Sequence, residues 1–213
     1  MRRFLVPLLL LGLLIAPAAV LAADSPNYVT LKLGMYQPGS KTLGTDDPPA
    51  DLKFKSGFNG ELAVGHKFMP NLAAELGVGM FSTKAGDFTT YEGGGIVEKA
   101  SIKVDVIPIT LNLKGIYPID KLDLYALGGV GLYRTKAKVD GIVDSVAVSE
   151  SKTKNAFGFQ LGVGADYNFM PNVFAGLEFK YLWAKPKFTF SNGDEYKAKI
   201  DGMQITANIG YRF

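Results

Sequence analysis

The sequence predicts an all-β protein: an eight-stranded antiparallel up-and-down transmembrane β-barrel, preceded by a cleaved signal peptide. Three observations predict this fold. Apolar and polar residues alternate along most of the chain after residue 23, which is typical of strands with two different faces. Short and long connections follow one another in turn. The first 23 residues have the three-part layout of an export signal.

Residues 1–23 are expected to be removed during export. Two arginines follow the initiating methionine, an apolar run covers residues 4–15, and small residues then allow cleavage after Ala22 or Ala23. A permanent membrane anchor is the alternative, but two prolines interrupt the run and the core between them is short for a span of about 20 residues. Residues 24–213 therefore form one predicted barrel domain.

Charge and composition exclude several classes of protein. Removing two of the 23 Lys+Arg residues with the signal leaves 21, against 20 Asp+Glu, a net charge of +1. No basic cluster stands apart from acidic neighbours, so nucleic acid is not an expected partner. The chain has no cysteine, which excludes a lipoprotein anchor, disulfides and thiolate metal sites. No cofactor is expected.

Eight segments carry the alternation. The last is the clearest, because apolar side chains from Met203 to Phe213 alternate with polar residues or glycine. One segment, 122–133, is ambiguous because its glycines blur both faces. In chain order the expected strands are 29–35, 58–67, 72–81, 107–114, 122–133, 157–169, 175–183 and 203–213.

The connections differ in length on the two sides of the predicted barrel. Tight turns are expected at 69–71, 118–121 and 170–172, and long polar loops near 38–55, 84–99, 139–153 and 184–199. Short turns on one side and long loops on the other are typical of outer-membrane barrels, in which the short turns face the periplasm. Both ends of the mature chain then fall on the periplasmic side.

The polar face of the strands is expected to line the lumen, and the apolar face to contact lipid. A soluble exported ligand-binding barrel is the alternative, with the faces reversed. Charges of both signs on the polar face favour the membrane barrel: Lys32, Glu61, Glu75, Lys114, Asp166, Glu178, Lys180 and Arg212. Aromatic residues near the strand ends also favour it, because they suit the two membrane interfaces: Tyr36, Phe58, Tyr117, Tyr167, Phe169, Tyr181 and Trp183.

A barrel of eight strands is just wide enough for its own side chains to fill. We therefore expect a plugged lumen or a very narrow water path, with the charges forming a packing network. Because buried unpaired charge is costly, each lumen cation should meet a carboxylate.

Catalytic and metal sites are not expected. The single histidine, His66, sits beside a periplasmic turn, and the paired acids Asp46-Asp47 and Asp194-Glu195 are interpreted as solvated loop residues. Residues 188–196 predict a hairpin with an Asn-Gly turn, flanked by paired bulges, that projects beyond the lipid. Its edge is a candidate site for a surface ligand that binds by strand addition.

The chain ends in Gly210-Tyr211-Arg212-Phe213, with a terminal Phe and an aromatic residue two positions before it. This ending resembles the C-terminal assembly signal of bacterial outer-membrane barrels, and residues 27–213 resemble the small OmpA/OmpX/OmpW-like barrels. The resemblance implies an outer-membrane location, contact with outer-membrane lipid, and recognition of Tyr211 and Phe213 by the barrel-assembly machinery. OmpW-like barrels have an apolar conduit, from which this charged lumen departs.

The function predicted from these features is a non-enzymatic envelope barrel with a structural or surface-interaction role. A narrow channel for small solutes remains the alternative, and a soluble exported binding barrel is a third possibility.

Overall fold

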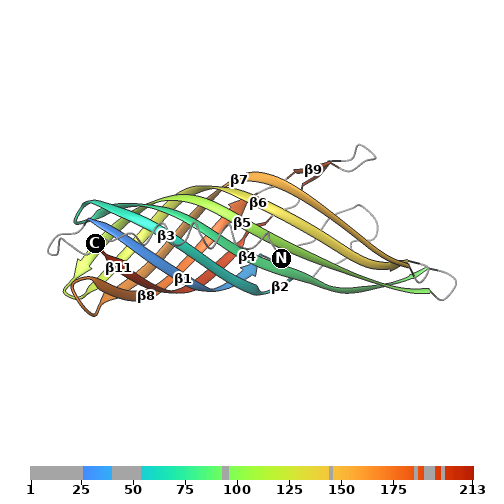
Figure 1. Cartoon of the computed structure of the whole chain (residues 1–213), viewed down its shortest axis with the longest axis horizontal. Coiled ribbons are helices and arrows are strands. Elements are labelled where there is room, and N and C mark those ends of the chain that lie inside the picture. Colours follow the sequence, from blue (N-terminus) through green and yellow to red (C-terminus); the bar gives the residue numbers. More distant parts are fainter. Residues whose placement is uncertain are drawn as a thin grey trace, which may run out of the picture.

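The computed structural model is a closed antiparallel β-barrel (Figure 1). It describes residues 26–39, 54–92, 96–143, 146–184, 187–189, 195–197 and 200–213. The predicted signal peptide, the long loop near 38–55 and the Asn-Gly turn lie wholly or largely outside these residues. Within them, no helix has the length and apolar character needed to cross a membrane.

Eight strands form the barrel wall, as the sequence predicts. Each pairs antiparallel with its neighbours, and pairing between β4 and β5 closes the ring. The wall strands are β1 (Asn27–Pro38), β3 (Gly57–Met69), β4 (Leu72–Glu92), β5 (Ile96–Ile119), β6 (Leu122–Val143), β7 (Val146–Asn168), β8 (Val173–Ala184) and β11 (Gly202–Arg212).

Three tight turns join the strands at one end of the barrel. In transmembrane β-barrels the short turns face the periplasm, so we call this the periplasmic end. They connect β3 to β4, β5 to β6 and β7 to β8, at the positions expected from the sequence. Asp120 in the second turn has a φ of 52°, a left-handed conformation that Asp tolerates better than most residues. The first and last wall strands begin and end here too, since Phe213 N–H donates to the Asn27 carbonyl at 2.9 Å.

The four central strands extend far beyond the other four at the opposite end (Figure 1). β4 to β7 have 21 to 24 residues each, whereas β1, β3, β8 and β11 have 11 to 13. The expectation of long loops at 84–99 and 139–153 is therefore wrong. β4 pairs with β5 as far as Glu92 and Ile96, and β6 with β7 as far as Val143 and Val146. About ten residues cross a membrane as a strand, so these two hairpins project well outside it.

The other three described strands have two or three residues each. β2 (Phe54–Lys55) pairs with β4 beyond the end of β3. β9 (Lys187–Thr189) and β10 (Glu195–Lys197) pair with each other as a separate two-stranded sheet, as the predicted hairpin requires. The paired bulges expected at its base are absent from the described residues. The register between β8 and β11 is continuous, and Ile200 N–H donates to the Ala184 carbonyl at 2.9 Å where the two strands separate.

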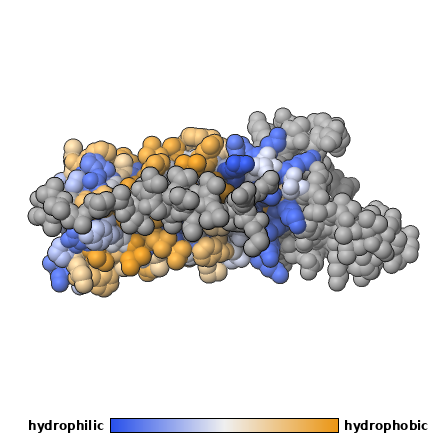
Figure 2. All heavy atoms as spheres, viewed as in Figure 1, coloured by the Kyte–Doolittle hydropathy of each residue, from blue (hydrophilic) through white to orange (hydrophobic). Residues whose placement is uncertain are grey.

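A belt of apolar side chains covers the outer face of the barrel on the side that Figure 2 shows. Large apolar residues are exposed at alternate positions of every wall strand, including the ambiguous β6, in which Leu124 and Leu132 point outward and Tyr125 and Leu127 are buried. Hydrophilic residues follow the belt at the end where the long strands project (Figure 2). Apolar residues outside and charged residues inside are the arrangement of a membrane barrel, which is the orientation that the sequence analysis favoured.

Inside the barrel, aromatic rings lie directly over glycines of the neighbouring strands. Tyr28 pairs in register with Gly65, and Tyr125 with Gly164. A Cβ atom at Gly65 would lie 2.0 Å from Tyr28 Cζ, and one at Gly164 would lie 2.3 Å from Tyr125 Cζ. The lumen glycines thus make room for rings and also for charged side chains, since a Cβ atom at Gly77 would lie 3.2 Å from Glu61 Cδ.

Candidate functional site

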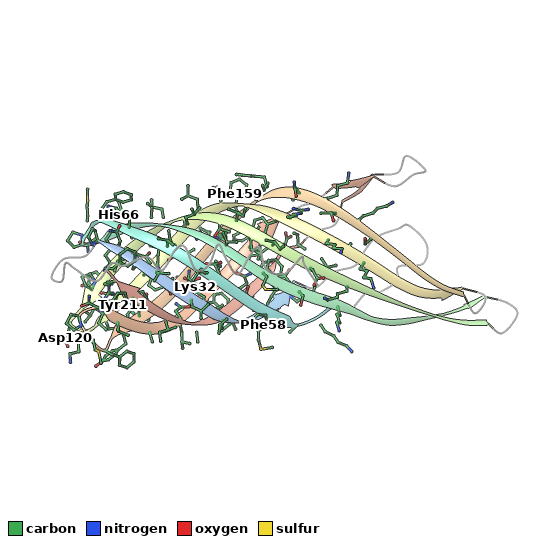
Figure 3. All side chains as sticks on the ribbon, viewed as in Figure 1. Lys32, Phe58, His66, Asp120, Phe159 and Tyr211 are labelled. Atoms are coloured by element: carbon green, nitrogen blue, oxygen red, sulfur yellow. The ribbon has the colours of Figure 1, made fainter. Side chains whose placement is uncertain are left out.

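The middle of the lumen holds three lysines and three glutamates, which we call the lumen charge cluster. Each occupies an inward position of a wall strand, and all are buried. The cluster comprises Lys32 of β1, Glu61 of β3, Glu75 of β4, Lys114 of β5, and Glu178 and Lys180 of β8. Figure 3 shows Lys32 midway between the periplasmic turns and the far ends of the short strands.

Lys32 is the centre of the cluster. Its Nζ lies 2.6 Å from Glu75 Oε1, 3.0 Å from Glu178 Oε2 and 3.2 Å from Glu61 Oε1. Its hydrogen bonds go to Glu75 Oε1 and to both carboxylate oxygens of Glu178, while Glu61 is held as an ion pair, so one lysine contacts carboxylates from three different strands. The cluster therefore ties β1, β3, β4 and β8 together through the lumen.

The other two lysines neutralise the charge that remains. Lys180 Nζ lies 2.8 Å from Glu61 Oε2 and 3.5 Å from Glu178 Oε1. Lys114 Nζ lies 3.3 Å from Glu75 Oε2 and 3.8 Å from the centre of the Tyr125 ring. Three cations thus face three carboxylates, and each cation contacts a carboxylate as the cost of burying charge requires.

Two tyrosines cover the cluster on its periplasmic side. Tyr28 OH donates to Glu75 Oε2 at 3.2 Å, and Tyr125 OH donates to Glu178 Oε2 at 3.1 Å. Their rings belong to a buried apolar layer with Ile116, Leu127 and others. The tyrosines therefore satisfy the carboxylates and cover the cluster on this side, while Lys114 also lines a small cavity at the periplasmic mouth with Asp123 and Arg212.

A second, smaller ion-pair group lies at that mouth. Arg212 Nη2 is 3.1 Å from Asp123 Oδ2, and Lys67 Nζ is 3.8 Å from the same oxygen. Asp123 and Lys67 were not among the predicted lumen residues. Asp123 lies on the strand in which glycines obscure the alternation of apolar and polar residues. Because Arg212 was expected to need a carboxylate partner, a search for that partner could have identified Asp123. Asp166, which was predicted, is buried nearby and accepts a hydrogen bond from Asn208 Nδ2 at 3.5 Å.

Two further layers of buried side chains lie in the lumen on the extracellular side of the cluster. The first contains buried amides and hydroxyls: Tyr133 OH donates to Gln160 Oε1 at 3.1 Å, and Gln160 donates in turn to Asn112. The second is a buried apolar cluster, which we call the apolar plug. It consists of Tyr36, Phe81, Val106, Tyr133, Leu182, Ala184 and Ile200.

Tyr36 does not belong to the aromatic girdle, contrary to our expectation. Its side chain is only 1% exposed, and its ring packs on Phe81 with 4.4 Å between ring centres. The expectation followed its height along the strand, but strict alternation with the outward Met35 turns Tyr36 into the lumen. The other predicted girdle residues point outward or are partly exposed: Phe58, Tyr117, Tyr167, Phe169, Tyr181 and Trp183.

His66 lies on the outer face at the periplasmic end (Figure 3). Its Nδ1 is 2.8 Å from Asn27 Oδ1, and its ring packs edge-on against Phe68. Among the residues that the structure describes, no three His, Cys, Asp or Glu side chains gather as metal ligands. Asp46, Asp47 and Asp194 lie outside these residues, as does the side chain of Glu195.

A closed barrel with an apolar outer belt and a charged interior defines an integral membrane protein of the transmembrane β-barrel class. Residues 6–213 match the family model described as the outer membrane protein beta-barrel domain, so the chain belongs to that family. The protein is therefore located in the bacterial outer membrane.

Solved structures share the fold at low sequence identity. The outer membrane protein OprG of Pseudomonas aeruginosa has a TM-score of 0.60 and 15% identity, with 90% of this chain and 98% of that chain covered. A major outer membrane protein of Thermus thermophilus has a TM-score of 0.61 and 16% identity, with 90% of this chain and 100% of that chain covered.

A putative adhesin of Rickettsia conorii is 28% identical over 70% of this chain and 63% of its own length, so the chain spans less than two thirds of that relative.

Proposed function

We propose that this protein is a non-enzymatic outer-membrane barrel with a closed lumen, and that it has a structural or surface-interaction role through the parts that project outside the cell. The observation that carries the proposal is the filling of the lumen. The charge cluster lies between the buried layer that contains the rings of Tyr28 and Tyr125, which we call the aromatic layer, and the apolar plug. An open path for solutes would require these layers to separate.

The absence of an enzymatic role is part of this proposal. His66 faces outward at the periplasmic end, away from the lumen charges. A Ser/His arrangement for acyl chemistry needs a nucleophile within hydrogen-bond reach of the histidine, and the contact observed for His66 is with the Asn27 amide. The roles of Tyr211 and Phe213 in recognition by the assembly machinery remain a prediction.

Planar-bilayer recording tests the closed lumen. The wild-type protein is expected to show no steady conductance, because charged and apolar side chains block the path. The pair Glu75→Ala and Lys114→Ala removes two long side chains of the cluster without changing net charge, and adding Tyr36→Ala and Phe81→Ala removes the two packed rings of the apolar plug. Discrete openings are expected in the variant that combines the four changes. The matched control for the charge pair is Lys103→Ala with Asp105→Ala, since this exposed pair, 3.0 Å apart, lies outside the barrel.

Wild-type conductance that is stable and selective for small solutes would overturn the closed lumen and favour a narrow channel. That second function has one observation in its support. Among the described side chains, Thr110 Oγ1, Asn112 Nδ2 and Gln204 Oε1 are buried without a hydrogen-bond partner in the protein, and all three could bind water in a narrow path.

The surface role is supported by the two long hairpins and by the likeness to a putative adhesin. Shortening β4–β5 by removing residues 87–99 and closing the strands with an Asn-Gly turn should leave the barrel wall intact, because Phe81 still pairs with Val106. Bacteria that display the full chain are expected to attach to cultured animal cells several times more often than bacteria that display the shortened chain. Equal attachment at equal display would contradict a surface role for this hairpin.

A further inference from the structure

Four lysines from four strands lie side by side on the outer face of the barrel, and we call them the lysine row. Lys55 of β2 pairs in register with Lys84 of β4, Lys84 with Lys103 of β5, and Lys103 with Lys138 of β6. Side chains directly opposite in antiparallel strands have Cβ atoms about 4.5–5.5 Å apart, and like charges at such positions are destabilising. The row is thus a costly arrangement for a surface that meets only water.

Two more basic residues adjoin the row on the same face. Lys136 pairs in register with Asp105, and Arg134 pairs with Ile107. On the outer face of β6, Lys136 lies nearer to the apolar belt than Lys138 does, and Arg134 lies nearer still. The one ion pair between described side chains on this patch joins Lys103 to Asp105, at 3.0 Å. Among the described side chains of this patch, Asp105 is the carboxylate that lies beside five basic residues: Lys55, Lys84, Lys103, Arg134 and Lys136.

The basic residues lie at the height of the lipid headgroups. Lys84, Lys103 and Lys136 each stand four residues from the nearest large apolar side chain described as exposed on the outer face of their strand, namely Met80, Ile107 and Leu132. Four residues at about 3.4 Å each, on strands tilted by about 40°, rise roughly 10 Å above that side chain. The headgroup region extends about 5–8 Å beyond each side of the hydrocarbon core. A lysine side chain at this height that bends toward the membrane therefore reaches the headgroups.

We propose that the lysine row binds the phosphate groups of anionic lipid headgroups in the outer leaflet. A sheet of lipid presents many phosphates along the curved wall at one height, which matches a row of cations contributed by successive strands. Lysine is a compact point charge that suits phosphate oxygens, and close anions offset the repulsion within the row. This inference depends on the outer-membrane location and not on whether the lumen is closed.

Binding of lipid A, which carries two phosphates, to the full chain in detergent micelles tests the proposal. The charge-removal variant Lys84→Gln, Lys103→Gln, Lys136→Gln is expected to bind roughly 100-fold more weakly, because each lysine near an anionic surface contributes about fivefold. The charge-keeping variant with Arg at the same three positions should bind within about threefold of wild type. Lys121→Gln, in a periplasmic turn, is the control for loss of an unrelated exposed lysine.

Dephosphorylated lipid A distinguishes phosphate recognition from binding of acyl chains, and inorganic phosphate distinguishes a lipid from a free anion. The proposal predicts weak binding of both by the wild-type protein. Equal binding of dephosphorylated lipid A would overturn it, as would undiminished lipid A binding by the charge-removal variant. Competition by millimolar inorganic phosphate alone, equal to that by lipid A, would overturn the assignment to lipid. Heat-dependent gel mobility of each variant verifies that the barrel is folded.

Discussion

Replacing Lys32 by Met is expected to destabilise the folded barrel by about 3–5 kcal/mol, since removal of one partner leaves buried carboxylates without compensation. Lys32 contacts Glu61, Glu75 and Glu178. Without Lys32, Glu61 and Glu178 share Lys180 and Glu75 keeps Lys114, so one of the three buried negative charges is left uncompensated. Methionine has a similar length and fits the space, so the loss reports charge and not volume. The three carboxylates would then share two lysines in a dry interior.

Urea unfolding in detergent micelles measures this change. The single tryptophan, Trp183, is 39% exposed on the lipid-facing side of β8, so its fluorescence reports on the barrel wall without involving the cluster. Lys121→Met in the exposed periplasmic turn is the matched control and should change stability by less than about 0.5 kcal/mol. Adding Glu75→Gln to Lys32→Met should recover part of the loss, because it removes one of the stranded charges. An unchanged midpoint for Lys32→Met would mean that the cluster does not hold the wall together.

Much of the wall could be predicted from the sequence because the bilayer imposes a strict rule on it. Every outward residue between the two interfaces meets lipid, so alternation has a period of two and reveals both strands and faces. The same rule placed Lys32, Glu61, Glu75, Lys114 and Glu178 inside. Where glycine replaces side chains on both faces, as in 122–133, the pattern weakens, and Asp123 was missed for that reason.

The projecting hairpins could not be predicted in the same way. Beyond the lipid neither face of a strand has to be apolar, so 84–99 and 139–153 resemble loops in composition although β4–β5 and β6–β7 remain paired there. The lysine row shows the same limitation. Lys55, Lys84, Lys103 and Lys138 are separated by 19 to 35 residues in the sequence, and only the strand register brings them side by side.

Filling the glycines beneath the lumen aromatics is the second change with a large expected effect. Gly65→Ala and Gly164→Ala should each cost about 1–3 kcal/mol, the usual penalty for overpacking. The new methyl group would overlap the ring of Tyr28 or Tyr125, and both rings are held in place by their hydroxyl hydrogen bonds to Glu75 and Glu178. Gly115→Ala is the matched control, because a Cβ atom there has no neighbour within 4 Å.

A double-mutant cycle separates ring overlap from a backbone effect of alanine. Tyr125→Leu alone removes the ring and its hydrogen bond to Glu178, and is expected to destabilise the barrel. If the cost of Gly164→Ala arises from the Tyr125 ring, then most of that cost disappears in the Tyr125→Leu background, and the two changes are strongly non-additive. Additive losses in urea unfolding would show that the glycine is required by the strand itself. Non-additivity would show that the glycine is needed because the Tyr125 ring, held over the charge cluster by Glu178, packs directly on it.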